Sequence, residues 1–455
     1  MHLSYGFKRN SFKLYHMGSN FFHTQWAGGV ILLFFVVVAM LLANLPFTAD
    51  LYHSFIEAPV GFTIGNINFE FRLEHLVNDG LMMIFFFTVG LEIKREIIHG
   101  HLSSFQKAIL PVAGALGGML APAIIYSLFN INSPYASGWG IPMATDIAFA
   151  IAILSVVGNK VPTALKIFLT ALAVADDLGA IIVIAIFYGS SINFTLLLIA
   201  ALLLALAWLF SRLKVNAFLP YILISVGLWF LFYNSGVHAT IAGVLLAMFV
   251  PSKEKYSKKY FVDKVKYFVN DFVQRDDNSP VSDNAAQISD IRTINHIAVG
   301  SLSLSQRFEY ILSPWVNFVI LPLFALVNAG VQIGSLAELN IFGTSQGMGI
   351  LFGLWIGKPL GITLMSWLFV KLKLAVMPEG ASWKMFAAVA CMGGIGFTMS
   401  IFMDTLAFSG MPDFIASGKI AILAASIIAA LTGYLAINYI HNRSVRPDDC
   451  ATNKK

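Results

Sequence analysis

The chain has 455 residues, of which 58% are hydrophobic and only 12% are charged, and its mean hydropathy is +0.76. A soluble globular protein carries about twice that share of charged residues, so the composition excludes this class and predicts a helical membrane protein with many spans. The net charge of +5 does not indicate nucleic-acid binding, and the two cysteines, Cys391 and Cys450, are too few for a disulfide framework or a metal site.

The N-terminal part of the chain predicts a surface segment, a first span and a hairpin. Residues 1–25 mix aromatic and basic side chains, which suits a cytoplasmic or interfacial segment. The apolar run 26–43 is too long for a signal peptide and lacks a cleavage site, so we expect an uncleaved span. Residues 61–71 alternate around a Gly65-Asn66 turn and predict an extracytoplasmic β-hairpin, whose open edge could pair with a second copy.

Eleven further apolar runs complete a prediction of twelve transmembrane helices. With both termini cytoplasmic, every Lys and Arg except Arg72, Lys358 and Lys419 falls on the cytoplasmic side, as the positive-inside rule requires. In the largest loop we expect a helix over 260–273 followed by a disordered stretch. The eleven runs are 76–91, 108–129, 140–157, 165–188, 194–210, 219–232, 237–250, 311–329, 349–370, 383–403 and 420–439. The chain thus divides into the segment 1–25, spans 1–8 over 26–250, a cytoplasmic loop over 251–306, spans 9–12 over 307–440 and a cytoplasmic tail over 441–455.

The main functional signal is the adjacent pair Asp176 and Asp177 near the middle of the fifth predicted span, 165–188. One charge at that depth costs at least ~2.5 kcal/mol, and neighbouring carboxylates disfavour each other's ionisation. The pair therefore suits the binding of protons or a small cation. Lys358 is also at mid-membrane depth, where ionisable residues mark ion pathways. Asp79 and Asp404 lie near span ends, and we expect them to reach water or to pair with a neighbour.

Two spans are interrupted, and their positions in the chain are related. Thr145 and Asp146 open a new helical run inside span 4, as an N-cap does, and three glycines within 392–399 weaken span 11. These are the middle spans of the triplets 3-4-5 and 10-11-12, which run in opposite senses, so the pattern predicts inverted repeats with two crossing broken helices. Asp146 suits the positive helix ends at such a crossing and Lys358 the negative ends. Lys358 could instead pair with the aspartate pair, and the sequence leaves this open.

Six motifs resemble, in the same order, those of the NhaA-type bacterial sodium/proton antiporters. The resemblance covers about 28–439 except for the loop. The motifs are ATDIAFA (144–150), ALKIFL (164–169), ADDLGAI (175–181), SGVHAT (235–240), GKPLGI (357–362) and GIGFTMS (394–400).

The resemblance implies roles for the residues in these motifs. Asp176 and Asp177 would bind either Na⁺ or Li⁺ or protons, with Asp177 as the more direct cation ligand. Asp146 with Thr145 would lie at the helix crossing, and Lys358 would pair with Asp176 or compensate the helix ends. The resemblance also implies a homodimer through the hairpin, in the lipid of a bacterial inner membrane, without a cofactor.

A cytoplasmic group implied by the resemblance concerns the pH response. Glu92, Arg95 and Glu96 are similar to part of a cytoplasmic network that governs it. Glu309 marks the start of span 9, where the family pattern has a Glu-His pair. Here Tyr310 follows instead, and tyrosine does not titrate near neutral pH.

The predicted function is an electrogenic Na⁺(Li⁺)/H⁺ antiporter, not an enzyme, which exports sodium by alternating access for sodium and pH homeostasis. The alternative is a sodium-coupled symporter of an organic anion on a similar fold, although the sequence has no spare mid-membrane Arg for the anion. An intramembrane aspartyl protease is a poor fit, because adjacent aspartates on one helix point about 100° apart.

Overall fold

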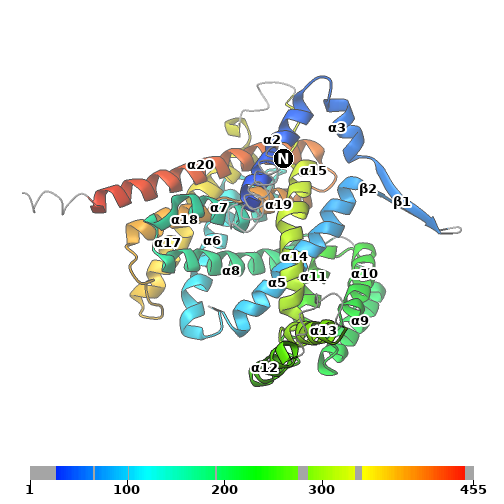
Figure 1. Ribbon diagram of the computed structural model, residues 1–455. Helices are drawn as coiled ribbons and strands as arrows, with labels where there is room; N and C mark the ends of the chain where they lie inside the picture. The colour runs from blue at the N-terminus through cyan, green and yellow to red at the C-terminus, as the bar shows by residue number, and fades with distance from the viewer. Residues whose placement is uncertain are drawn as a thin grey trace, which may run out of the picture. The chain divides into compact units, whose positions relative to one another are not determined.

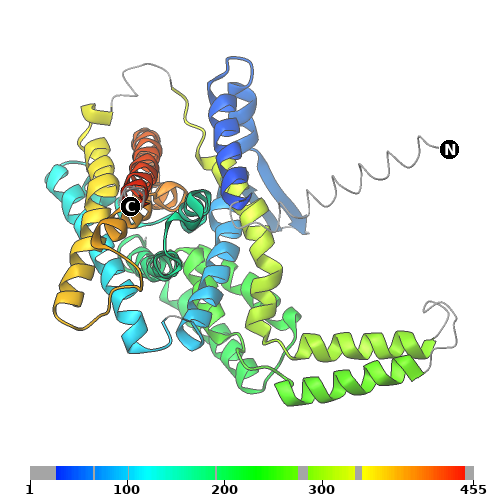
Figure 2. The ribbon, with the colours of Figure 1, turned by 60° about the vertical axis from the view of Figure 1, so that its left-hand side comes forward.

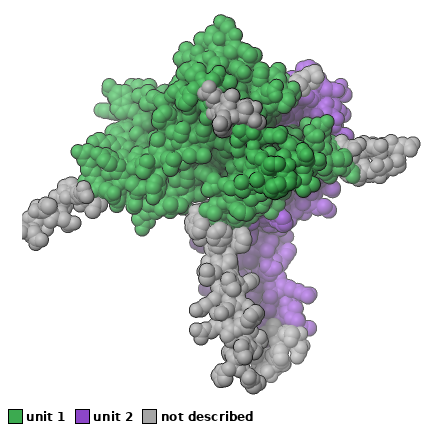
Figure 3. Space-filling view, turned by 90° about the horizontal axis from the view of Figure 1, so that it is seen from above, with its two compact units in different colours: residues 1–82, 96–190, 316–455 green, residues 83–95, 191–315 purple. Residues whose placement is uncertain are grey.

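Helices form nearly all of the regular structure (Figure 1), as expected for a chain whose backbone groups meet no water in the hydrocarbon core. The computed structural model describes residues 27–64, 67–100, 102–189, 192–274, 285–333 and 341–445. The predicted segment 1–25 and the chain after 445 lie outside these ranges. The chain forms two compact units (Figure 3): unit 1 contains Met1–Met82, Glu96–Ser190 and Val316–Lys455, and unit 2 contains Met83–Arg95 and Ser191–Trp315.

Unit 1 contains both interrupted spans and the helices around them. Within it, α6 packs along α17, and α20 packs against α16 and α18. The helical elements of unit 1 are α2 (Ala27–Asn44), α3 (Ala49–Ile56), α4 (Leu73–His75), η1 (Leu76–Leu81), α6 (Phe105–Phe129), η2 (Ala136–Met143), α7 (Ile147–Val157), η3 (Gly158–Lys160), α8 (Thr163–Phe187), η5 (Val316–Ile320), α15 (Leu321–Asn328), η6 (Ile341–Gly343), α16 (Ser345–Phe352), η7 (Gly353–Gly357), α17 (Lys358–Lys371), α18 (Trp383–Gly393), α19 (Phe397–Ala407) and α20 (Pro412–Val445).

Unit 2 contains most of one helix from early in the chain and all those from the middle. In it α9 packs against α10, and α12 and α13 lie side by side as a helical hairpin (Figure 2). Its elements are most of α5 (Met82–Ile98), α9 (Phe194–Arg212), α10 (Phe218–Ser235), α11 (Ala239–Phe249), α12 (Lys258–Gln274), α13 (Ala285–Gly300) and α14 (Leu304–Trp315).

The loop prediction is right for its first half and wrong for its second. The expected helix over 260–273 is α12, but the stretch expected to be disordered contains α13. This helix could not be recognised from an apolar pattern, because two of its buried residues, Gln287 and Asp290, are polar. Gln287 Nε2 donates a hydrogen bond to the Phe272 carbonyl at 3.2 Å and so ties α13 to α12.

The predicted twelve spans are not confirmed. Among the described residues, ten helices are long and apolar enough to cross a membrane, and the bent pair α18 and α19 makes an eleventh. The eighth predicted run, 237–250, corresponds to α11, which has only 11 residues where a full span needs about 20. The ten helices are Ala27–Asn44, Leu73–Ile98, Phe105–Phe129, Ala136–Lys160, Thr163–Phe187, Phe194–Arg212, Phe218–Ser235, Leu304–Asn328, Ser345–Lys371 and Pro412–Arg443.

The predicted β-hairpin is present. Strands β1 (Pro59–Ile64) and β2 (Ile67–Arg72) pair antiparallel, with Pro59 opposite Arg72 and Ile64 opposite Ile67. The expected Gly65-Asn66 turn lies outside the described residues. The two strands form a sheet of their own, so neither has a second neighbour within it.

Both predicted helix interruptions are also present, and they meet. Three residues, 144–146, separate η2 from α7, and 394–396 separate α18 from α19, which are inclined by 48°. The backbone N–H of Asp146 donates a hydrogen bond to the Ile395 carbonyl at 2.7 Å. Backbone groups that the breaks release from their helices are thus paired inside the protein, the condition under which broken helices are tolerated at membrane depth.

Glycines let α6 and α17 approach until their backbones touch. A Cβ atom at Gly361 would lie 2.0 Å from the Gly117 carbonyl oxygen, and one at Gly117 would lie 2.1 Å from the Gly361 carbonyl oxygen. Small residues at a crossing allow such close packing in membranes. Lys358 is the first residue of α17, directly after the π-helical turn η7. The close packing of α17 therefore fixes the start of the Lys358 side chain inside unit 1.

Candidate functional site

Asp176 and Asp177 lie in the interior of α8. Their exposed fractions are 0% and 1%, so neither carboxyl group reaches the surface of the protein. Because successive helical residues are turned by about 100°, the two side chains leave α8 in different directions. The two aspartates can therefore have different partners while they remain parts of one site.

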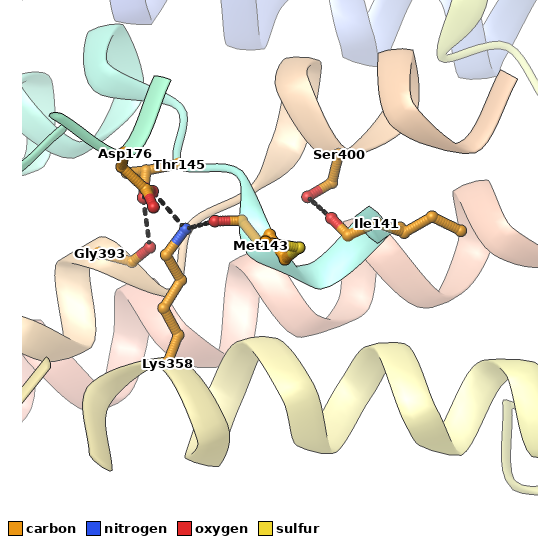
Figure 4. A network of polar contacts seen from close by, with 7 residues as sticks. All are labelled: Ile141, Met143, Thr145, Asp176, Lys358, Gly393 and Ser400. Carbon is orange, nitrogen blue, oxygen red and sulfur yellow. Dashed lines mark hydrogen bonds and ion pairs between the residues drawn. The ribbon is translucent and has the colours of Figure 1, made fainter. Parts of the chain in front are cut away.

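Asp176 is the centre of a polar network that joins both helix breaks (Figure 4). Lys358 Nζ donates to Asp176 Oδ2 at 2.6 Å and also to the Met143 carbonyl, and both side chains of this ion pair are 0% exposed. Thr145 Oγ1 lies 2.7 Å from Asp176 Oδ2 and 3.0 Å from the Gly393 carbonyl oxygen. Side chains from α8 and α17 thus meet backbone groups from the ends of η2 and α18.

The sequence left two roles open for Lys358, and its contacts include both kinds. It pairs directly with Asp176, and it donates to the carbonyl of Met143, the last residue of η2, where the helix end carries partial negative charge. Lys358 also interacts electrostatically with Asp177. Among the described residues no group donates to Asp176 Oδ1. One oxygen of the Asp176 carboxylate is therefore available to a proton or a cation.

Asp146 binds the N-termini of both helices that begin at the crossing. Its Oδ1 accepts from the Phe149 N–H of α7 at 3.0 Å. Its Oδ2 accepts from Thr398 of α19, at 3.2 Å from the backbone N–H and 2.6 Å from the hydroxyl. A carboxylate at a helix N-terminus stabilises the helix because it compensates the partial positive charge there. One side chain here serves two helix ends.

The chain is similar over nearly its whole length to known transporters. The family model described as Na⁺/H⁺ antiporter 1 matches residues 19–437. A protein of Sulfurimonas denitrificans named Na(+)/H(+) antiporter NhaA is 42% identical over 424 residues, which cover 92% of this chain and 94% of that protein. Proteins of the same name from Acidithiobacillus ferrooxidans and Enterobacter sp. are 44% and 42% identical, over 91% and 96% of this chain and 95% and 100% of their own. The chain belongs to this antiporter family.

Membership confirms the resemblance predicted from the six motifs, and these relatives are named as antiporters rather than as enzymes. Two residues of the helix crossing, Thr398 and Ser400, had no role in the sequence-based prediction. Ser400 Oγ donates to the Ile141 carbonyl at 2.8 Å and holds α19 to η2 (Figure 4). Both hydroxyls lie in the first turn of α19, after the glycine break, and hydroxyl side chains beside a break in an apolar span are the signal that could have identified them.

Two of the four residues that the resemblance connects with the pH response form an ion pair. Arg95 on α5 forms an ion pair with Glu309 on α14, both within unit 2, and their side chains are 44% and 14% exposed. Glu92 and Glu96 are on α5 with Arg95. Tyr310, which stands where the family pattern has His, is 81% exposed.

Proposed function

We propose that this antiporter exchanges Na⁺ for protons at Asp176 and Asp177, with Lys358 as an internal competitor for the Asp176 carboxylate. The fully buried Lys358–Asp176 ion pair next to Asp177 carries this proposal. Membership of the Na⁺/H⁺ antiporter family supports the exchange. The comparisons give no support to the alternative of a sodium-coupled symporter of an organic anion.

Charge balance explains why such a site would exchange ions rather than bind them together. A buried site tolerates little net charge, because uncompensated ions are strongly destabilised away from water. With the carboxylates ionised, Lys358 supplies one positive charge at 2.6 Å from Asp176. A Na⁺ ion that enters adds another, so its binding is favoured when protons have left the carboxyl groups. Proton release and cation binding are thereby coupled.

The helix crossing would supply the movement that alternating access requires. Na⁺ would bind from the cytoplasm, unit 1 would rearrange, and protons would replace the cation from outside. If two protons exchange for one cation, one net charge moves inward per cycle, and the membrane potential supplies ~2.3 kcal/mol per 100 mV. Li⁺ carries the same charge, and we expect it to be transported as well.

Location and assembly are part of the same proposal. We expect the chain in a bacterial inner membrane, with both termini cytoplasmic and spans 3-5 and 10-12 as inverted repeats. Among the described residues, β1 and β2 pair only with each other. An open strand edge can pair with another strand, so we expect a homodimer through this hairpin.

Proton flux in everted membrane vesicles tests the exchange at this site. An imposed pH gradient should dissipate when Na⁺ or Li⁺ is added to vesicles with the native chain. The response should be lost with Asp177→Asn and retained with Asp263→Asn, which makes the same chemical change at an exposed position on α12. If Asp177→Asn retains the full cation response in correctly inserted protein, the proposed site is wrong.

A further inference from the structure

Unit 1 contains a second buried polar cluster, formed by Asp404 on α19, Gln346 on α16 and Lys419 on α20. Asp404 and Gln346 are both 0% exposed, so of the two expectations for Asp404 the pairing with a neighbour agrees with the structure and the direct exposure to water does not. Gln346 Nε2 donates to Asp404 Oδ1 at 3.4 Å and to the Phe414 carbonyl at 3.1 Å. An ionisable residue buried at membrane depth is expensive and is by default a functional candidate. The exchange site described above does not use this one.

Two acceptor atoms of this cluster lack a hydrogen bond. Among the described residues, nothing donates to Asp404 Oδ2 or to Gln346 Oε1, although both atoms are buried. Because the Phe414 carbonyl can only accept a hydrogen bond, the Gln346 amide must turn its nitrogen, and not its oxygen, toward Phe414. A buried acceptor without a hydrogen bond destabilises the folded protein. A proton on Asp404 Oδ2 would turn one of these acceptors into a donor for the other.

The ionised form of Asp404 has a second partner besides the Gln346 amide. Lys419 interacts electrostatically with Asp404, and its side chain is only partly exposed. Gly418 precedes it, and a Cβ atom there would lie 2.3 Å from Asp404 Oδ1, so α20 passes directly against the carboxyl group. Among the described residues, Asp404 also interacts electrostatically with Tyr126 of α6 and Tyr188 after α8, and Glu74 of α4 interacts with Lys419.

We propose that Asp404 is a second proton-binding residue of this chain, separate from Asp176 and Asp177. Its carboxylate takes up one proton on Oδ2 from water and returns it to water. The Gln346 amide N–H and Lys419 both favour the carboxylate, and Gln346 Oε1 is an acceptor that a proton on Oδ2 can use. A side chain with a suitable partner in each state can load and unload a proton without a large rearrangement.

The position of Asp404 connects it with the exchange site. It is six residues after Thr398 on α19, which is about 9 Å along a helix at 1.5 Å per residue. Ser400, one turn before Asp404, donates to η2. The predicted topology places the Asp404 end of α19 on the extracytoplasmic side, where protons enter during export of Na⁺. This role in transport rests on the proposed function, but proton binding by Asp404 does not.

Infrared difference spectroscopy of the full chain in liposomes, titrated with acid in the absence of Na⁺ and Li⁺, tests the proton binding. The C=O stretching band of a protonated carboxyl group should lose one titrating component in Asp404→Asn and keep it in Asp177→Asn. Asp404→Glu keeps a carboxyl group and should show the component at a shifted frequency. This shift identifies the component even if the Asn variant does not fold. Identical titrations of the native chain and of folded Asp404→Asn would overturn the proposal.

Two variants test the assigned partners. Lys419→Met removes the positive charge that favours the carboxylate, so the midpoint of the Asp404 component should move to higher pH by about one to three units. Gln346→Leu removes the amide N–H that donates to Asp404 Oδ1 and puts an apolar group in its place, so the midpoint should also move to higher pH. A midpoint that stays unchanged in both variants would overturn the assignment of these partners.

The role in transport has its own measurement. In everted vesicles, Asp404→Asn should shift the pH of half-maximal exchange while the Na⁺ concentration for half-maximal rate at the optimum stays the same, and Asp404→Glu should restore the profile. A purely structural residue would lower the rate without moving the profile. An unchanged profile would reject the role in transport, whereas loss of all exchange in the native chain would reject the proposed function instead.

Discussion

Two ion pairs among the described residues differ in almost every physical respect. Lys358 and Asp176 in unit 1 are both 0% exposed, and backbone carbonyls and a threonine complete their surroundings. Arg95 and Glu309 in unit 2 are 44% and 14% exposed. Water can replace either partner of the second pair, but nothing comparable can replace a partner of the first. A charge in the first pair must therefore be exchanged for another charge, and this is the property that an exchanger needs.

Loss of Lys358 should have the largest effect on the buried pair. Lys358→Met leaves Asp176 buried without a positive partner, and breaking a buried pair in this way costs about 3–5 kcal/mol. We expect the free energy of unfolding in detergent to fall by this amount at neutral pH. The loss should become smaller as the pH falls, because a protonated Asp176 no longer needs the compensating charge.

Lys358→Arg is the matched control for this prediction, because it keeps the positive charge. It should recover most of the lost stability. Equal unfolding free energies for the native chain and Lys358→Met across this pH range would show that Asp176 carries no charge in the folded protein, and the comparison between the two pairs would then fail.

The sequence was sufficient to predict the broken spans and the charged residues of the site, but not their contacts. Asp146 and Lys358 stand out because ionisable residues are rare in apolar runs, and the glycines of 394–396 mark a break directly. Which oxygen meets Lys358 depends on the relative rotation of α8 and α17, which helical periodicity does not encode. For a related reason the sequence could not decide whether Asp404 reaches water or pairs with a neighbour: its nearness to a span end allows both, and the packing of α20 at Gly418 against its carboxyl group depends on tertiary structure.

Packing at the α6–α17 crossing should have the next largest effect. Gly361→Ala places a methyl group where the Gly117 carbonyl lies 2.0 Å away, and backbone cannot yield as a flexible side chain does. Overpacking of this kind costs about 1–3 kcal/mol, and the displaced start of α17 should weaken the contact of Lys358 with Asp176. We expect a lower unfolding temperature and a reduced rate of cation-dependent proton flux.

Gly28→Ala is the control for the α6–α17 crossing. A Cβ atom at Gly28 of α2 meets its nearest neighbour, Asn317 Cβ, at an ordinary distance of 3.4 Å. This variant should leave unfolding temperature and flux near those of the native chain. Similar losses in both variants would indicate a general sensitivity to alanine in the helices rather than a specific role of the crossing.

The exposed pair should have the smallest effect on stability. Arg95→Gln and Glu309→Gln should each change the unfolding free energy by less than about 1 kcal/mol, because exposed ion pairs contribute roughly 0.2–1 kcal/mol and are screened by salt. A double-mutant cycle in detergent measures the coupling between the two side chains directly. Because these residues resemble a pH-response group, we expect both variants to retain Na⁺-dependent flux while the pH of half-maximal flux moves. A coupling of several kcal/mol between Arg95 and Glu309 would be as large as that expected between Lys358 and Asp176. It would show that burial does not distinguish the two pairs, and that the buried position of Lys358 is not what makes its charge exchangeable.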